Sequence, residues 1–515
     1  MVDNSVLVAL PVAASCVLRD FQTRFLYPFH FARRCTKEAL AALRLETFSA
    51  RDCQPRPLWE AVEARHLYKD ELLDHVVRFL FGGGETCCGY VKIADAAANS
   101  WFAQAEVTIG DQAMAVRSVP GGRIELFLSP QGVGVLSLAL MPGHNSLLLE
   151  DAVEFNYRLA QFRRRPVGRL RKRHPQDDPM TWDKMSPDDR SAMLSAPPDD
   201  APLAQRLGVP GGSFTLAELV AHLVEPLGKL GLRVDQSELS VHTIARFDAK
   251  ADFGDDTAHT RLAPFLSALA QVEEPGHSGM PPGKLGVPDA ILNRRHWAAV
   301  GLLGSAHLIA DQGDKEFDEQ KMAVVRDKYF IPFLVALLQR LALNRGIEEA
   351  GKLLSSATPK VPESLVVLRD DLLRFAIEGH FTQVSSRHAL HRFYLLAREG
   401  LDVPCAWDEV RRAIADLEAR FSAQRQSQIA QGIARNIRMV ARVQSIAEVV
   451  EIFIVSVYAA HLWDMFAKGN EFLETHLLPD WRPWIIHGGV IAFALLGGLI
   501  TLLLVRPWRH EDQSD

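Results

Sequence analysis

Four ionisable side chains interrupt an apolar stretch near the C-terminal end of the chain. Residues 446–466 read IAEVVEIFIVSVYAAHLWDMF and carry Glu448, Glu451, His461 and Asp464. Acidic groups within a membrane segment are costly and usually face water or a partner, and rings of carboxylates concentrate cations. The chemistry that these side chains could do is therefore the attraction of a cation. Glu451 and Asp464 are the candidate metal-contacting residues.

Either of two stripes along this segment would face a common axis if several copies of the chain assembled. The first stripe is mainly apolar and ends in a histidine and an aspartate: Val443, Ala447, Val450, Ile454, Val457, His461 and Asp464. The second carries the two glutamates: Gln444, Glu448, Glu451, Val455, Tyr458, Leu462 and Met465. The first predicts a hydrophobic constriction that gates by dewetting, and the second predicts carboxylate rings near the inner mouth. The candidate pore-lining residues are Val450, Glu451, Ile454, Val457, Tyr458 and His461.

The acidic residues also have a structural interpretation. Glu448 is expected to lie at the inner interface of the membrane, where it would pair with Arg438 or Arg442, and the same position is open to Glu451. Asp464 either lies at the outer mouth of a pore or simply ends the helix. The sequence leaves these alternatives open.

A second apolar segment follows at residues 484–505. Its 22 residues include no Asp, Glu, Lys or Arg, and at 1.5 Å per residue a helix of this length crosses the roughly 30 Å hydrocarbon core of a bilayer. Trp481, Trp484 and Trp508 flank it, as an aromatic belt at the two interfaces would require. We therefore predict a transmembrane helix here. We predict that residues 446–466 form the other membrane-spanning helix of a hairpin with this one. The alternative is that residues 446–466 form a buried amphipathic helix in the soluble part of the protein.

Basic residues predict the orientation of this hairpin. Residues 411–442 hold seven arginines against two acidic residues, and the tail 506–510 is also basic. Because basic flanks stay on the cytoplasmic side, both termini are expected inside and the loop 467–483 outside. The predicted location is the inner (cytoplasmic) membrane, crossed twice.

A long helix must position the first span. Residues 407–466 contain no proline and only one glycine, Gly432. Apolar residues recur at three-to-four spacings along it: Val410, Ile414, Leu417, Phe421, Ile429, Ile433, Ile437 and Val440. This pattern predicts one amphipathic helix that runs through a juxtamembrane part, 401–445, into the span at 446–466. Its apolar stripe needs a partner in the same protomer or in a neighbouring one.

The remainder of the chain is expected to form an α+β cytosolic domain with an antiparallel or mixed sheet and helices. Short apolar runs separated by Gly and Pro turns predict strands at 89–94, 105–109, 114–119, 123–129 and 132–141, after a first strand at 6–10. Helical patterning covers 19–24, 36–45, 58–81 and 146–165. Residues 1–165 thus form the predicted α/β domain, 166–213 a Pro-, Asp- and Gly-rich linker or surface excursion, and 214–400 a mixed, mainly helical region. Within that region, 328–343 is predicted as a buried helix too short to span a membrane.

Composition and motifs exclude several classes of protein. The chain is 48% hydrophobic and 23% charged with a mean hydropathy of -0.00, which excludes a disordered chain and a membrane protein with many spans. The net charge of -6 gives no general attraction to nucleic acid, and the basic run 162–174 is interpreted as a solvated helix end. No nucleophile elbow, HExxH motif, carboxylate dyad or kinase signature is present, so neither an enzyme nor a cofactor is expected. His388 and His391 are more typical of a helix surface than of a metal pair.

The order of these elements resembles that of the CorA-type magnesium transporter family. The resemblance covers mainly residues 365–510 and rests on architecture. It implies a homopentamer in which five first spans line the pore and five long helices form a funnel. The family signature is Gly-Met-Asn after an aromatic residue, and the ungapped equivalent here reads Trp463, Asp464, Met465 and Phe466. Only the aromatic residue and the methionine match.

Two classes of function follow. The leading hypothesis is an oligomeric membrane channel or transporter for Mg²⁺ or another divalent cation, with a large cytosolic regulatory domain. The alternative is a membrane-anchored sensor or effector that does not transport magnesium, such as a CorA-like accessory protein of a prokaryotic defence system. In both cases the expected partners are further copies of the chain and the lipid bilayer.

Overall fold

The chain divides into two units, Met1–Leu417 and Glu418–Asp515, which we describe separately. The computed structural model describes residues 17–48, 56–62, 71–82, 87–94, 105–109, 112–118, 124–142, 147–161, 169–172, 214–234, 239–247, 257–273, 289–293, 295–355, 361–469 and 481–505.

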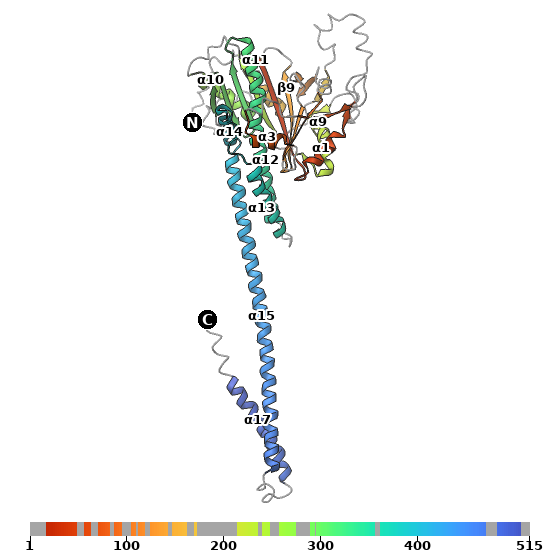
Figure 1. Ribbon diagram of the computed structural model, residues 1–515, viewed down its shortest axis with the longest axis vertical. Helices are drawn as coiled ribbons and strands as arrows, with labels where there is room; N and C mark the ends of the chain where they lie inside the picture. Colours follow the sequence, from red (N-terminus) through yellow and green to blue (C-terminus); the bar gives the residue numbers. More distant parts are fainter. Residues whose placement is uncertain are drawn as a thin grey trace, which may run out of the picture. The chain divides into compact units, whose positions relative to one another are not determined.

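One large mixed sheet organises the first unit, with β1 (Val17–His30) at its centre (Figure 1). β1 pairs antiparallel with β9 (Val133–Pro142) on one side and with β14 (Ser240–Phe247) on the other. β14 pairs in parallel with β17 (Gly304–Ala310), which pairs antiparallel with β16 (His296–Gly301). The sheet therefore joins strands that lie more than 200 residues apart in the sequence.

Shorter strands extend and branch this sheet. They are β4 (Trp59–Ala61), β5 (Gly89–Ile93), β6 (Ala105–Ile109), β7 (Gln112–Ser118), β8 (Ile124–Leu128), β10 (Leu147–Leu148), β11 (Arg169–Lys172), β12 (Phe214–Thr215), β13 (Arg233–Val234) and β15 (Asp289–Asn293). β2 (Thr47–Phe48) and β3 (Arg56–Pro57) form a separate two-stranded ribbon.

Helices cover both faces of the sheet and create two hydrophobic cores. The first core receives α1 (Thr36–Arg44), α5 (Leu149–Gln161), α9 (Leu216–Val224), the 3₁₀ turn η3 (Glu225–Leu230) and α10 (Thr257–Gln271). The second receives α3 (Asp74–Phe81), α12 (Phe330–Ser355), α13 (Val361–Glu378), α14 (His388–Gly400) and the start of α15 (Val403–Gly469). α11 (Lys315–Val324) enters α12 through the π-helical turn η4 (Val325–Tyr329). Alternate residues of β1 supply the two cores: Phe25 packs in the first and Leu26 in the second.

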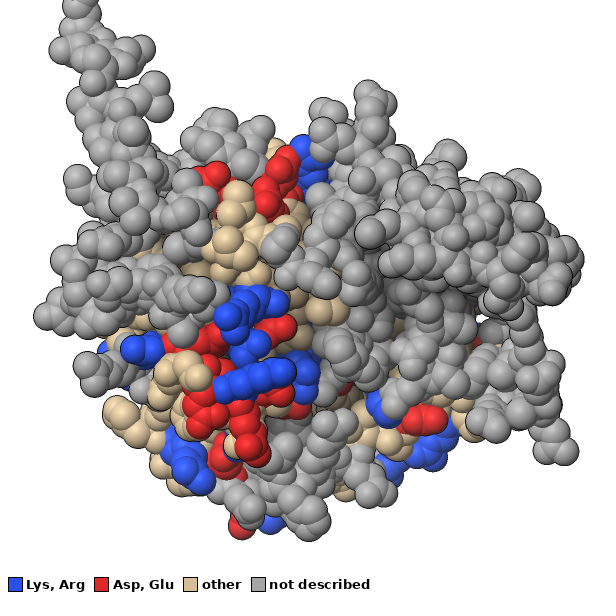
Figure 2. Space-filling view, turned by 90° about the horizontal axis from the view of Figure 1, so that it is seen from above, with Lys and Arg blue, Asp and Glu red and all other residues tan. Residues whose placement is uncertain are grey.

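The surface seen from above carries mixed charge. Figure 2 shows Lys and Arg side chains adjoining Asp and Glu side chains on this face, rather than a field of one sign. Exposed pairs of this kind contribute little to stability. The described residues of this face therefore present charges of both signs.

The second unit contains the rest of α15 and α17 (Arg482–Val505). α17 runs back alongside the C-terminal part of α15 (Figure 1). The continuous helix predicted over 407–466 and the helix predicted over 484–505 are both confirmed, because strong 3.6-residue periodicity and uniform apolarity are local signals. The helices predicted at 36–45, 146–165 and 328–343 and the five strands between 89 and 141 are confirmed as well.

Two local predictions for the first unit are wrong. Residues 19–24 lie within β1 rather than in a helix. Because both faces of β1 are covered, its polar side chains are buried along with its apolar ones, and the period-two alternation that identifies a half-exposed strand is lost. Residues 58–81 do not form one helix either: the segment begins in β4, and helix α3 starts only at Asp74.

One sheet crosses the domain boundaries predicted at 165 and 214. β14, β16 and β17 belong to the region 214–400, predicted as mixed and mainly helical, and they extend the sheet that β1 and β9 begin. β11, from the predicted linker 166–213, pairs with β6 at the far side of the same sheet. The strand predicted at 6–10 and the other residues of that linker lie outside the described residues.

Candidate functional site: a membrane hairpin

The C-terminal part of α15 packs against α17 through one face that centres on Trp463. The indole Nε1 of Trp463 donates a hydrogen bond to the carbonyl oxygen of Ile486 at 3.2 Å. Its ring stacks on Phe493 with 4.7 Å between ring centroids. Gly489 lies directly beneath the ring, where an added Cβ would come within 2.0 Å of Nε1. Glycine at 489 therefore permits the closest approach of the two helices.

Small residues continue this contact along the hairpin. A Cβ on Gly497 would lie 3.1 Å from the Cβ of Ala459, and one on Gly498 would lie 3.0 Å from Oγ of Ser456. The Ser456 hydroxyl donates to the carbonyl oxygen of Ile452 at 2.7 Å, so it leaves no unsatisfied polar group at the interface. Helices in lipid associate through small residues of this kind, because no hydrophobic effect operates there between them.

The packing predicts a sharp difference between two adjacent glycines. Replacing Gly489 by Val should destabilise the hairpin by about 1–3 kcal/mol, because the new side chain overlaps Trp463. The matched control is Gly488→Val, since a Cβ at 488 meets nothing within 4 Å. Unfolding of the full chain in mixed micelles of increasing denaturing-detergent content, followed by Trp fluorescence, measures the effect. Equal behaviour of the two variants would contradict the contact.

The predicted pore-lining residues lie on other faces of α15. The α17 contact uses Ile452, Ser456, Ala459 and Trp463. At 3.6 residues per turn, the stripe Val450, Ile454, Val457 and His461 lies about 160° around the helix from that contact, and the stripe with Glu451 and Tyr458 lies about 100° around it. In the single chain Val450, Ile454 and Val457 are 50%, 47% and 52% exposed. The mainly apolar stripe thus faces away from the hairpin partner.

The outer-mouth residues have separate roles in the single chain. Trp463 is committed to the α17 contact, whereas Met465 and Phe466 are exposed. Asp464 accepts a hydrogen bond at Oδ2 from Lys468 Nζ at 2.5 Å, one turn further along α15. This ion pair offsets the negative charge of Asp464, which the sequence predicts as a metal-contacting residue.

Three helices of the described residues are long and apolar enough to cross a membrane. In one of them, Lys315–Ser355, 78% of the most apolar 18-residue stretch is buried in the first unit, so this helix is a core element. The corresponding 18-residue stretches of Val403–Gly469 and Pro483–Ile500 are 0% buried. Apolar surface on this scale indicates association with a membrane.

A row of buried polar side chains, which was not predicted from the sequence, crosses the sheet beneath α12. Arg24 on β1 donates from Nη1 to Oε2 of Glu125 on β8, and the Tyr90 hydroxyl donates to Oε1 of Glu125 at 2.6 Å. Arg24 is 3% exposed and Glu125 is 6% exposed. The guanidinium carbon of Arg24 lies 4.1 Å from the centroid of the Phe330 ring. The pair is therefore sealed from water by the start of α12.

Three buried histidines continue this row. Nδ1 of His242 hydrogen bonds with Oγ of Ser305 at 2.7 Å, and Nε2 of His296 hydrogen bonds with Nδ1 of His307 at 2.9 Å. Among the described residues, no group of three or more His, Cys, Asp or Glu side chains is arranged to hold a metal ion. Each histidine occupies an inward position of an apolar strand, which is a signal that the sequence carries. The row is a structural feature of the core.

Burial keeps these histidines neutral. Desolvation lowers the pKa of His296 to about 3 and lowers the pKa values of His242 and His307 well below the usual range, and the charge of Arg24 adds to the effect on His242. The unfolded chain binds protons to these side chains near pH 6.5, whereas the folded chain does not. Stability therefore falls as the pH falls below 6.5.

This acid sensitivity is measurable. Lowering the pH from 8 to 5 is expected to cost about 2 kcal/mol of unfolding free energy through His296 alone. Denaturant unfolding of the full chain, followed by circular dichroism at the two pH values, tests the expectation. His296→Gln, which keeps a neutral hydrogen-bonding side chain, should lose that share of the pH dependence. An unchanged pH dependence in this variant would contradict the assignment.

No family model, curated protein or solved structure matches the chain. The resemblance to CorA-type transporters, predicted from the order of the elements, accordingly stays a prediction.

Proposed function

We propose that the chain is one subunit of an oligomeric membrane protein that conducts cations along an axis lined by the C-terminal part of α15. The first unit is its cytosolic regulatory domain. The observation that carries this proposal is the placement of the mainly apolar stripe about 160° from the face that binds α17. With α17 on one side of α15, the opposite side is available to line a shared axis.

A seven-residue repeat supports assembly through this stripe. Alternating steps of three and four residues run from Ile433 through Asn436, Val440, Val443, Ala447, Val450, Ile454 and Val457 to His461 and Asp464. Ile433, Val440 and Val443 are 53%, 64% and 62% exposed in the single chain. Such a repeat favours a left-handed supercoil of parallel helices. Subunits that cross one membrane in the same orientation place their α15 helices parallel to one another, as this supercoil requires. A polar residue such as Asn436 within the repeat fixes register.

The stripe gives the proposed pore its chemistry. Val450, Ile454 and Val457 form a hydrophobic constriction that gates by dewetting, while His461 and Asp464 lie toward its outer end. Carboxylates there, and at Glu451 on the adjacent stripe, favour cations over anions. The proposed cargo is Mg²⁺ or another divalent cation. The proposed assembly is a homopentamer in the inner membrane, with two spans per subunit and both termini in the cytoplasm.

Two observations favour a second function. Asp464 is paired with Lys468, and the asparagine of the CorA-type signature is replaced by Phe466. Both changes weaken a cation site at the outer mouth. A membrane-anchored sensor or effector, in which the first unit does the recognition and the hairpin holds it at the bilayer, needs no such site.

Ion flux distinguishes the two functions. The full chain, purified as an oligomer and reconstituted into vesicles that contain a divalent-sensitive dye, is expected to admit Mg²⁺, Ni²⁺ or Co²⁺. Protein-free vesicles made from the same lipids are the control. The absence of flux from a verified oligomer would exclude transport and favour the anchored sensor.

A further inference from the structure

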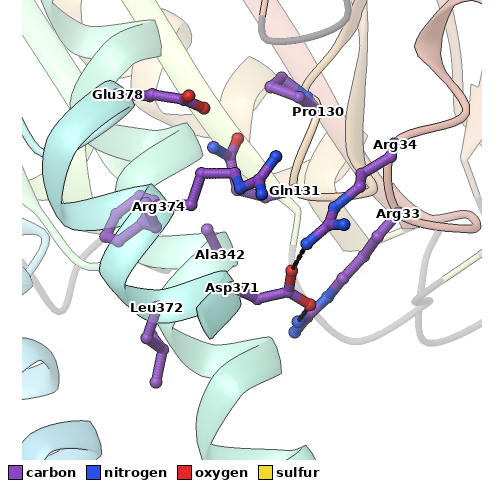
Figure 3. Close-up of a pocket in the computed structure, with 10 residues that line it drawn as sticks. Arg33, Arg34, Pro130, Gln131, Ala342, Asp371, Leu372, Arg374 and Glu378 are labelled. Carbon is purple, nitrogen blue, oxygen red and sulfur yellow. Dashed lines mark hydrogen bonds and ion pairs between the residues drawn. The ribbon is translucent and has the colours of Figure 1, made fainter. Parts of the chain in front are cut away.

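A small pocket in the first unit lies between the segment that follows β1 and helix α13. Its volume is about 80 Å³. It is lined by Arg33, Arg34, Pro130, Gln131, Ala342, Asp371, Leu372, Arg374, Phe375 and Glu378 (Figure 3). Three guanidinium groups therefore meet at one hollow.

The backbone brings two successive arginines to this pocket. Arg33 and Arg34 follow the end of β1, and Arg34 has a φ of 61°, a left-handed conformation that side-chain-bearing residues rarely adopt. In an extended strand neighbouring side chains point to opposite faces. Here both side chains reach toward α13 (Figure 3). Strained backbone of this kind concentrates at functional sites.

A carboxylate of the chain itself occupies the space between these two side chains. Arg33 donates from Nη1 to Oδ2 of Asp371, and Arg34 donates from Nη2 to Oδ1 at 2.6 Å. The side chain of Asp371 is 14% exposed. Guanidinium pairs of this geometry recognise carboxylate and phosphate oxygens alike, so Asp371 marks where an oxyanion would bind.

Two donor groups of the pocket make no hydrogen bond in the part of the chain that the structure describes. Arg33 Nε is buried and has no partner. The guanidinium of Arg374, one turn beyond Asp371 on α13, points across the pocket toward Gln131 (Figure 3). Glu378 also lines the pocket, and Arg33 is paired with a second carboxylate, because its Nη2 donates to Oε2 of Glu349 at 2.6 Å. Among the described residues, Arg33 and Arg34 are paired with carboxylates and Arg374 is not, so the Arg374 guanidinium is the one that an added anion would meet.

A fourth arginine nearby is structural and is not available to a ligand. Arg345 Nη1 donates to the carbonyl oxygens of Phe31 and Gly132 at 2.8 and 2.5 Å, and its Nε donates to Glu349 at 3.0 Å. Gly132, with a φ of 73°, makes room for this contact, because a Cβ there would lie 2.3 Å from Arg345 Nη1. Arg345 thus joins α12 to the segment after β1 and to the turn at Gln131, which lines the pocket.

We infer that this pocket binds a phosphate-type oxyanion, which Arg33, Arg34 and Arg374 hold in the position that Asp371 occupies in the free chain. The pocket volume of about 80 Å³ exceeds what a single water needs, and it suits one tetrahedral oxyanion. Binding displaces Asp371 and so removes the ion pairs that join α13 to the end of β1. The inference does not depend on the function proposed for the hairpin.

Calorimetric titration of the full chain with inorganic phosphate, at constant ionic strength and against chloride, tests the inference. Asp371→Asn removes the competing charge but keeps the shape of the side chain, and it should tighten phosphate binding about tenfold. Arg374→Gln removes one charged donor and should weaken binding about tenfold. Arg369→Gln, on the same helix but outside the pocket lining, is the matched control and should leave affinity unchanged.

A nucleoside monophosphate in parallel titrations identifies the source of the phosphate group. Affinity equal to that of inorganic phosphate supports free phosphate as the ligand, and tighter binding supports a phosphate carried on a larger molecule. The inference is overturned if neither wild type nor a folded Asp371→Asn variant shows saturable phosphate binding. It is also overturned if Arg369→Gln weakens binding as much as Arg374→Gln. Should Asp371→Asn fail to fold, the phosphate affinity of Arg374→Gln, a change at an exposed position, still tests the inference.

Discussion

Replacing Glu125 by Ala is expected to destabilise the first unit by about 3–5 kcal/mol, because it leaves the Arg24 guanidinium buried without its carboxylate. Among the described residues, Arg24 would keep its contact with the Phe330 ring, which does not replace a paired charge. Denaturant unfolding of the full chain, followed by circular dichroism, measures the loss. This is the largest effect on stability that we expect from any single charge removal in the sheet.

Two controls separate the buried charge from ordinary loss of an ion pair. Glu60→Ala removes the partner of Lys92 on the neighbouring strands, where the Glu60 side chain is 50% exposed, and it should cost at most about 1 kcal/mol. The double variant Arg24→Met with Glu125→Leu replaces the pair by apolar groups of similar size and should recover most of the stability. If the double variant is as unstable as Glu125→Ala, packing rather than charge controls this site.

Replacing Ile454 by Asn should raise cation flux through the reconstituted chain by about tenfold or more. A polar side chain in the hydrophobic constriction favours water there, and lowering the barrier by about 1.4 kcal/mol increases the rate tenfold. Ile454 is 47% exposed and lies on the stripe opposite the α17 contact. Dye-loaded vesicles with the protein at matched density measure the initial rate.

Val455→Asn is the matched control, because it makes a similar change one residue further on, in the stripe that contains Glu451. The two stripes make opposite predictions for this pair of variants. A larger increase from Val455→Asn would place the second stripe on the axis. No increase from either variant, with wild-type flux intact, would contradict a hydrophobic gate in this helix.

Much of the helical architecture could be predicted from the sequence. Helices α15 and α17 were identified from local periodicity and apolarity, and α1, α5 and α12 from shorter stretches of the same signals. Strand β1 was not identified from the sequence. It is covered on both faces, so it buries Arg24 and Gln22 beside its apolar residues and shows no alternation of apolar and polar residues. The pairing of β1 with β14 was missed because no local pattern reports contacts between distant segments.

For the candidate sites too, features within one helix could be predicted from the sequence, whereas contacts between distant segments could not. The stripes of α15 follow from spacing within one helix, so their residues could be named in advance. Which stripe faces away from α17 depends on Gly489 and Gly497, whose role appears only when the two helices are packed. The arginine pocket joins Arg34 to Asp371 across 337 residues. Its members have no spacing that would identify them.

The most direct test of the central claim is disulfide cross-linking of cysteine variants in intact membranes. If the Ile454 stripe lines an axis shared by several copies, Val457→Cys should give covalent dimers on mild oxidation, because identical side chains on an axis come close together. Leu495→Cys, on α17 and 69% exposed in the single chain, is the matched comparison and should give none above the native background. Dimers from Leu495→Cys and none from Val457→Cys would contradict an axis lined by α15.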